Sequence, residues 1–257
     1  MSRRHLSFAC EGALLAGTLD EAPGTTGLLI VSGGNETRAG AFGGQAELAA
    51  RIAAAGFPVF RFDRGGVGDS EGENLGFRQS APDIAAALAA FRQAAPAVTR
   101  VAGFGNCDAA SALMLSHGQG FDALALANPW TIEGGNNAPP PDAIRARYGE
   151  KLRNPREVLR LFTGKVSFAK LARGLVRAIR PAPSPTGLAD EISDGLGHFG
   201  GPALILLASR DRTAQMFELG WPVADTRIRR CVGASHAFAE ADARDWLFER
   251  LLELLRA

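Results

Sequence analysis

One cysteine stands where the sequence places a strand directly before a helix. Residues Val101–Ser111 read VAGFGNCDAAS, an apolar run that leads into an alanine-rich stretch. A sharp strand-to-helix turn needs small residues two positions either side of the turning residue, and Gly105 and Ala109 meet that need. A helix N-terminus favours the thiolate, the nucleophilic form of cysteine. Cys107 is therefore a candidate nucleophile, with a buried, inert thiol as the alternative.

The next residue argues in the opposite direction. Asp108 places a carboxylate beside Cys107, and its negative charge opposes the thiolate if the side chain turns inward. The other two cysteines, Cys10 and Cys231, lie within strand-like runs, and we expect both in the core.

The segment around Cys107 resembles the nucleophile elbow of the α/β-hydrolases, written G-x-S-x-G, with cysteine for serine and alanine for the last glycine. In that superfamily an acid and then a histidine follow the nucleophile along the chain. Asp211 comes just past the apolar run 203–208, and His236 comes between a later strand and the last helix. The other acid position of the superfamily holds Asn128. The resemblance therefore implies Cys107 as nucleophile, His236 as base and Asp211 as the acid that orients it.

The same resemblance implies a pair of backbone donors for a developing oxyanion. One is the amide after the nucleophile, here the N–H of Asp108. The other comes from the loop after an early strand, here Ser32-Gly33-Gly34-Asn35, in which Gly34 is the first candidate and Asn35 the second.

A glycine-rich turn, Phe62–Ser70, resembles the superfamily motif D-x-R-G-x-G-x-S, and we interpret it as structural. Gly65 stands where that motif has arginine, so the contact of that arginine is lost unless Arg64 replaces it. The turn lacks the lysine of a phosphate-binding P-loop and the G-x-G-x-x-G spacing of a dinucleotide site. No metal or organic cofactor is expected.

Three segments, SGGNETRAG, FPVFRFDRGGVGDSEG and GFGNCDAAS, look like a bacterial group called exosortase A system-associated hydrolase 1. That resemblance implies a cytoplasmic hydrolase linked to surface-polysaccharide and protein-sorting systems. A cysteine nucleophile is also similar to the dienelactone hydrolases, which cleave small lactones and esters. We expect hydrolysis of a small-molecule acyl ester or thioester. The alternatives are acyl transfer with the same triad and a catalytically silent binding protein.

The rest of the chain alternates short apolar runs with alanine- and leucine-rich stretches of helical spacing, which predicts an α/β fold with a mostly parallel sheet and helices on both faces. An N-terminal hairpin of Leu6–Cys10 and Ala13–Leu19 is expected to precede the parallel part. The expected strands are Leu28–Ser32, Val59–Asp63, Val98–Gly105, Ala123–Asn128, Ala203–Ala208 and Arg227–Val232, and the expected helices are Gln45–Ala55, Ala81–Ala94, Asp108–His117 and Ala241–Arg256.

The alternation fails between residues 130 and 200, which we interpret as a helical lid inserted between core segments 1–129 and 201–257. Within it, Arg145–Arg180 carries eleven Lys or Arg and two acids, a net +9 that leaves −8 for the remaining residues. Its apolar residues recur at helical steps, as on one face of an amphipathic lid. A solvated basic face is as well supported as contact with an anionic substrate or weak contact with a membrane surface.

Composition limits the classes of protein that the chain can represent. Its 257 residues are 46% hydrophobic and 21% charged, which predicts a globular domain and excludes disordered and coiled-coil classes. A net charge of +1 gives no electrostatic case for nucleic acid. Three cysteines without zinc-ligand spacing suit a reducing compartment, and no secretory signal or membrane span is evident, so we expect a cytoplasmic location. The histidines His5, His117 and His198 are expected to be structural or solvated.

Overall fold

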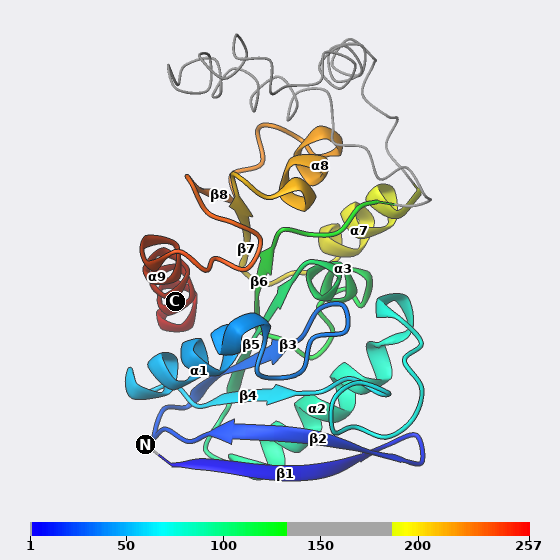
Figure 1. Ribbon diagram of the computed structural model, residues 1–257, viewed down its shortest axis with the longest axis vertical. Helices are drawn as coiled ribbons and strands as arrows, with labels where there is room; N and C mark the ends of the chain where they lie inside the picture. Colours follow the sequence, from blue (N-terminus) through cyan, green and yellow to red (C-terminus); the bar gives the residue numbers. More distant parts are fainter. Residues whose placement is uncertain (1, 133–186) are drawn as a thin grey trace, which may run out of the picture.

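The computed structural model describes residues 2–132 and 187–257, and in this part of the chain one eight-stranded sheet carries helices on both faces (Figure 1). The strand order is β1-β2-β4-β3-β5-β6-β7-β8. Strand β2 runs antiparallel to β1 and β4, and all other neighbouring strands are parallel. The strands are β1 Arg3–Cys10, β2 Ala13–Asp20, β3 Thr26–Val31, β4 Val59–Phe62, β5 Arg100–Asn106, β6 Ala123–Ala127, β7 Ala203–Ala208 and β8 Ile228–Cys231.

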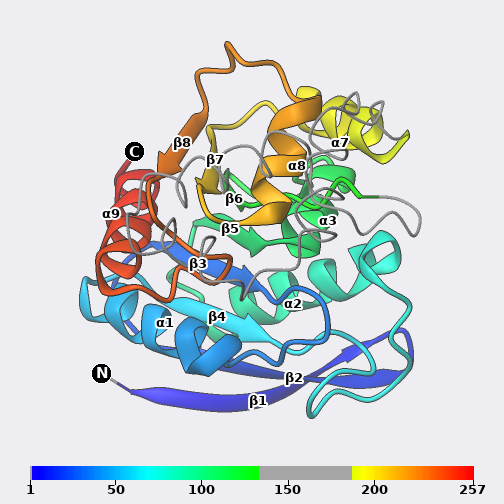
Figure 2. The same cartoon turned by 45° about the horizontal axis from the view of Figure 1, so that its top comes forward.

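Among the α-helices of the described residues, α1 Gly44–Ala54 and α9 Ala241–Arg256 cover one face of the sheet and the others lie on the opposite face (Figures 1 and 2). Helices α2 Ala81–Ala94, α3 Asp108–Leu115, α7 Gly187–Gly197 and α8 Arg212–Gly220 pack on this opposite face, and short 3₁₀ turns η1 Ala41–Gly43 and η2 Phe77–Gln79 lie in loops. The predicted fold class, a mostly parallel α/β sheet covered on both faces, is confirmed.

The central strands are continuous apolar runs because both of their faces are buried. Strands β3 and β6 present almost nothing but buried residues to either helical layer. Their registers bring Val31 opposite Gly105 and Asn106 opposite Ala127, so the carboxyl ends of β3, β5 and β6 meet at one edge of the sheet. The loops that leave this edge carry the candidate site residues.

The predicted lid is described only in part. Residues 133–186, which include the basic segment, lie outside the described residues. Helix α7, near the C-terminal end of the predicted insertion, packs against α3 with Leu188, Ile192 and Leu196 buried in the main core.

Candidate active site

Cys107 lies at a strained turn between β5 and α3. Its backbone has φ 64° and ψ −127°, a region that non-glycine residues rarely occupy, at a cost of about 1–3 kcal/mol. The turn is held by the Cys107 amide, which donates to the Ala127 carbonyl at 2.9 Å. A Cβ at Gly105 would stand 2.7 Å from the backbone of Ala109, so only glycine lets the strand and helix approach this closely. The side chain of Cys107 is partly exposed.

His236 and Asp211 reach the same edge of the sheet from later in the chain. His236 Nδ1 lies 2.9 Å from Asp211 Oδ2, and the Asp211 side chain is 7% exposed. Asp211 is also the N-cap of α8, where its Oδ2 accepts the Ala214 amide at 3.1 Å. The hydrogen bond to Asp211, followed by one to the Cys107 side chain, raises the pKa of His236 to about 10. Cys107, His236 and Asp211 thus form one hydrogen-bonded line.

Two side-chain amides, that of the buried Asn128 and that of the partly exposed Asn106, fix the backbone of His236, and sequence reasoning missed both. Asn106 Nδ2 and Asn128 Nδ2 each donate to the His236 carbonyl at 3.1 Å. Asn128 also donates to Asn106 Oδ1 at 2.9 Å and accepts the Ala208 amide at 2.8 Å. Asn128 therefore links β5, β7 and the loop that carries His236, which we call the histidine loop. It stands just after β6, at the alternative acid position of the superfamily. The sequence signal was a lone asparagine at the end of an otherwise apolar run.

The candidate oxyanion loop follows β3 and lies against the elbow. The Gly34 amide donates to Asp108 Oδ1 at 2.6 Å, so the Asp108 side chain does turn inward. Asn35 Oδ1 accepts Asn74 Nδ2 at 2.7 Å, which directs that side chain toward a neighbouring loop. The structure thus brings Gly34 and Asp108 together beside Cys107, and the Asp108 carboxylate occupies the Gly34 amide, the first candidate that the resemblance implied for an oxyanion donor.

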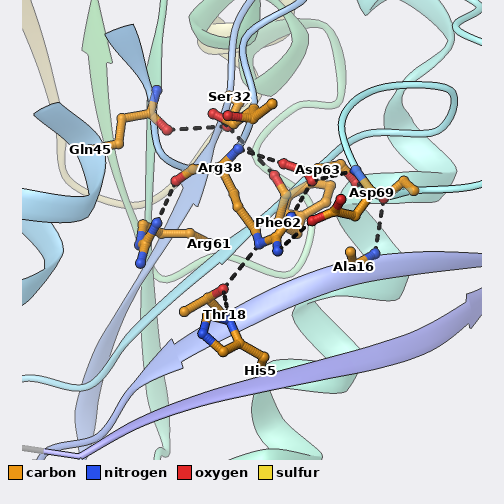
Figure 3. Close-up of polar contacts among 12 residues, drawn as sticks. His5, Ala16, Thr18, Ser32, Arg38, Gln45, Arg61, Phe62, Asp63 and Asp69 are labelled. Carbon is orange, nitrogen blue, oxygen red and sulfur yellow. Dashed lines mark hydrogen bonds and ion pairs between the residues drawn. The ribbon is translucent and has the colours of Figure 1, made fainter. Parts of the chain in front are cut away.

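The glycine-rich turn anchors the oxyanion loop through two arginines. Figure 3 shows Arg38 turned toward the buried Asp63, whose carboxylate accepts both the backbone and the guanidinium of Arg38. Arg64 donates to the Gly34 carbonyl, and its Nη2 lies 3.5 Å from Asp108 Oδ2. Gly65 instead gives its amide to Asp83 at 2.8 Å. Arg64, the residue before the motif position, thus contacts both the oxyanion loop and Asp108.

The remaining cysteines and histidines occupy structural positions. Cys10 and Cys231 are buried, as predicted, and burial raises the pKa of both thiols, that of Cys10 to about 11 with a further contribution from Asp83. His5 bonds the hydroxyl of Thr18 at 2.9 Å, and His117 stacks on His198 with 5.3 Å between ring centroids. Cys107 is the one cysteine with partial exposure and a histidine partner.

A cavity of about 380 Å³ adjoins the site between α1 and α9. Asn106, Ala237 and Glu36 contribute to its wall, and each is within two residues of Cys107, His236 or Gly34. Its other wall residues include Leu48, Phe104, Phe238 and Leu247. Among the described residues there is no cluster of three or more His, Cys, Asp or Glu that could hold a metal ion. In the same ranges no helix is long and apolar enough to cross a membrane.

Comparison with solved structures identifies the class of fold. The α/β hydrolase GrgF from Penicillium sp. sh18 is 17% identical with a TM-score of 0.66, and covers 100% of this chain and 98% of its own. Est1E from Butyrivibrio proteoclasticus, solved with ferulic acid, is 15% identical with a TM-score of 0.62, covering 98% and 100%. A thioesterase domain from the curacin biosynthetic pathway is 14% identical with a TM-score of 0.56, covering 98% and 100%.

The chain therefore has the α/β-hydrolase fold. No family model matches the sequence, and no curated protein matches it.

Proposed function

We propose that this chain hydrolyses acyl esters or thioesters through a covalent acyl-enzyme formed on Cys107. The observation that carries the proposal is the hydrogen-bonded line of Cys107, His236 and Asp211 at the turn between β5 and α3. Nucleophile, proton carrier and orienting acid in this order are what acyl transfer requires. The likeness in fold to an esterase and a thioesterase domain adds support from analogy alone.

The hydrogen bonds to Asp211 and Cys107 raise the pKa of His236 to about 10, so its ring is protonated near neutral pH. We infer that Cys107 reacts as the thiolate partner of this ring, because a neighbouring imidazolium favours the nucleophilic form of cysteine. The Cys107 sulfur then attacks the carbonyl carbon directly, without waiting for a base to remove its proton. The C=O π-electrons move onto the carbonyl oxygen, and the amides of Asp108 and Gly34 are the donors assigned to it.

Collapse of that intermediate needs an acid. His236 gives its proton to the departing alkoxide or thiolate as the carbon–oxygen or carbon–sulfur bond breaks, and an S-acyl cysteine remains. Neutral His236 then takes a proton from water as the water oxygen attacks the acyl carbon. The thiol sulfur leaves with its electron pair, which releases the acid and restores the ion pair. Asp211 holds the ring throughout through Nδ1.

One observation favours a second candidate, a catalytically silent binding protein. The carboxylate of Asp108 accepts the Gly34 amide at 2.6 Å, and a donor engaged in this way is not offered to an oxyanion. A silent fold member would still present the cavity between α1 and α9 to a small ligand.

We further propose, from the motif resemblance, a link to the exosortase-associated group and a cytoplasmic location. The net charge of +9 over Arg145–Arg180 supports a proposed contact with an anionic substrate or a weak contact with a membrane surface.

Kinetic measurements on a panel of short and medium acyl esters and thioesters distinguish an active hydrolase from a catalytically silent binding protein. We expect wild type to turn over at least one class and Cys107→Ala to fall to the uncatalysed rate. Cys107→Ser should retain a small fraction of the activity, because a serine hydroxyl is a weaker nucleophile at its free pKa than a cysteine thiol. Full activity in Cys107→Ala contradicts the mechanism, and no turnover by wild type across the panel supports the silent alternative.

A further inference from the structure

The amide that the proposed mechanism assigns to the oxyanion already has an acceptor. Gly34 donates to Asp108 Oδ1 at 2.6 Å, and Asp108 directly follows the nucleophile. A carboxylate at this place competes with an oxyanion for the same proton and repels its charge. Substrate carbonyl oxygen and Asp108 carboxylate therefore cannot both use the Gly34 amide.

We propose that Asp108 controls access to the oxyanion hole by holding the Gly34 amide in the resting enzyme and moving its carboxylate to Arg64 when a substrate carbonyl arrives. The inference rests on the proposed function, because an oxyanion forms only in acyl transfer. Asp108 is then a positioning residue that decides which carbonyl compounds acylate Cys107.

Arg64 provides the second observation. Its side chain is buried, with 4% exposed, and its Nη2 donates to the Gly34 carbonyl and lies 3.5 Å from Asp108 Oδ2. Arg64 Nη1 is also buried and has no hydrogen-bond partner within the described ranges 2–132 and 187–257. A buried guanidinium nitrogen without an acceptor is costly, and it marks a place that a carboxylate fills well.

The two positions of the carboxylate differ in the kind of hydrogen bond they offer. On Gly34, one oxygen accepts a neutral amide while the other remains at 3.5 Å from the guanidinium. On Arg64, both oxygens can meet the two terminal nitrogens in a bidentate, charge-assisted pair. The Gly34 loop keeps its place during the exchange, because Arg64 binds its carbonyl and the contacts of Arg38 with Asp63 anchor its far end. The exchange therefore frees one N–H without moving the backbone.

Two substitutions of Asp108 distinguish the effect of its hydrogen bond with the Gly34 amide from the effect of its negative charge. Asp108→Asn removes the charge and keeps a side-chain oxygen that can still accept from Gly34, whereas Asp108→Ala removes both. For each protein we compare the acylation rate with p-nitrophenyl acetate and the alkylation rate with iodoacetamide. Alkylation of a thiolate forms no oxyanion, so the ratio of acylation to alkylation reports on the oxyanion donors alone.

We expect the ratio to rise about 10-fold or more in Asp108→Ala and to change much less in Asp108→Asn, since one oxyanion donor is worth about 10²–10³ in rate. Asp122→Asn is the matched control. It removes a carboxylate that accepts the Val101 amide at 2.8 Å at the opposite end of β5, and its ratio should equal that of wild type. Thermal melts verify that each variant is folded.

The Arg64 half of the proposal needs a double-mutant cycle. Arg64→Lys should slow acylation several-fold in the wild-type background, because lysine cannot offer a bidentate site, and should have a smaller effect in Asp108→Ala, where only the contact with the Gly34 carbonyl is altered. Equal slowing in both backgrounds shows that Arg64 acts through the loop alone and overturns the exchange.

The outcomes at position 108 separate the two proposals from each other. If wild type acylates but Asp108→Ala is no faster relative to alkylation than Asp108→Asn, the control by Asp108 is wrong and the hydrolase proposal stands. If Asp108→Ala loses acylation, Asp108 assists catalysis instead, which also overturns it. If neither wild type nor Asp108→Ala acylates while both are alkylated, the proposed function itself fails and the inference fails with it.

Discussion

His236 Nδ1 lies 2.9 Å from Asp211 Oδ2, and that same oxygen caps the N-terminus of α8. One buried carboxylate thus fixes a helix and the imidazole ring of His236 together, which ties the orientation of that ring to the main body of the fold.

Asp211→Asn should reduce kcat/KM by about 10²–10⁴, because an amide orients the ring poorly and does not stabilise its positive charge. The hydrogen bond to Asp211 is the largest cause of the raised pKa of His236, so its loss lowers that pKa from about 10 toward the ordinary value. The alkaline limb of the pH–rate profile should therefore move to lower pH. An unchanged alkaline limb would mean that another group produces it.

The raised pKa of His236 also links folding to pH. A group whose pKa is higher in the folded state stabilises the protein fully below its unfolded pKa and loses that contribution as pH rises through the folded value. The free energy of unfolding of wild type relative to His236→Gln should be most favourable below about pH 6.5 and should decline until about pH 10. Urea denaturation at several pH values measures this, and a difference that grows with pH contradicts the ion pair.

Asn128→Ala should lower both stability and kcat. It removes donors to the His236 carbonyl and Asn106 and leaves the buried Ala208 amide without its acceptor, at about 1–3 kcal/mol for each unsatisfied group. Asn106→Ala removes a contact to the same carbonyl but leaves the link to β7, so we expect it to be milder in denaturant unfolding. Equal activity of Asn128→Ala and wild type would show that the loop carrying His236 keeps its position without the hydrogen bond from Asn128.

Gly105→Ala should destabilise the fold by about 1–3 kcal/mol, because its Cβ would stand 2.7 Å from the backbone of Ala109 and force the elbow open. Gly44→Ala provides the contrast at the start of α1. It has φ −61° and no atom within 4 Å of an added Cβ, so it should stabilise by about 0.4–1 kcal/mol. Thermal or urea unfolding of both variants measures the difference, and similar effects of the two would count against the close approach at Gly105.

One thiol of three should react with iodoacetamide in the native protein. Cys10 and Cys231 are buried and burial raises their pKa, whereas Cys107 is partly exposed beside a protonated histidine. Peptide mapping after brief labelling should find the adduct on Cys107, and labelling of all three at similar rates contradicts the packing described.

The bounds of several helices and strands could be predicted from the sequence, because they depend on residues that are close together in the chain. Helices α2 and α9 and strand β7 begin and end where the alternation predicts, since each combines a long periodic or fully apolar run with clear flanking residues. Helix α7 falls within the segment predicted to be a helical insertion but was given no bounds of its own, and α8 was not predicted. Gly195 lets α7 approach α3 so closely that an added Cβ would meet the Met114 carbonyl at 2.1 Å, a contact that no local pattern reveals.

The candidate site likewise combines residues that could be predicted from the sequence with contacts that could not. The resemblance to the superfamily motif and order along the chain was sufficient to nominate Cys107, Asp211 and His236, because their positions relative to the predicted strand ends can be read locally. The inward turn of Asp108 onto Gly34 and the amides that hold the His236 carbonyl join residues 74 to 130 positions apart. Side-chain direction in such contacts depends on the assembled sheet, so residue type alone could not supply it.

Mass spectrometry of the protein mixed rapidly with a thioester and quenched in acid tests the central claim most directly. The account predicts an increase in mass equal to one acyl group, located on the peptide that contains Cys107, retained longer in His236→Gln and absent from Cys107→Ala. An acyl group on any other residue, or turnover with no adduct on wild type or on His236→Gln, would contradict it.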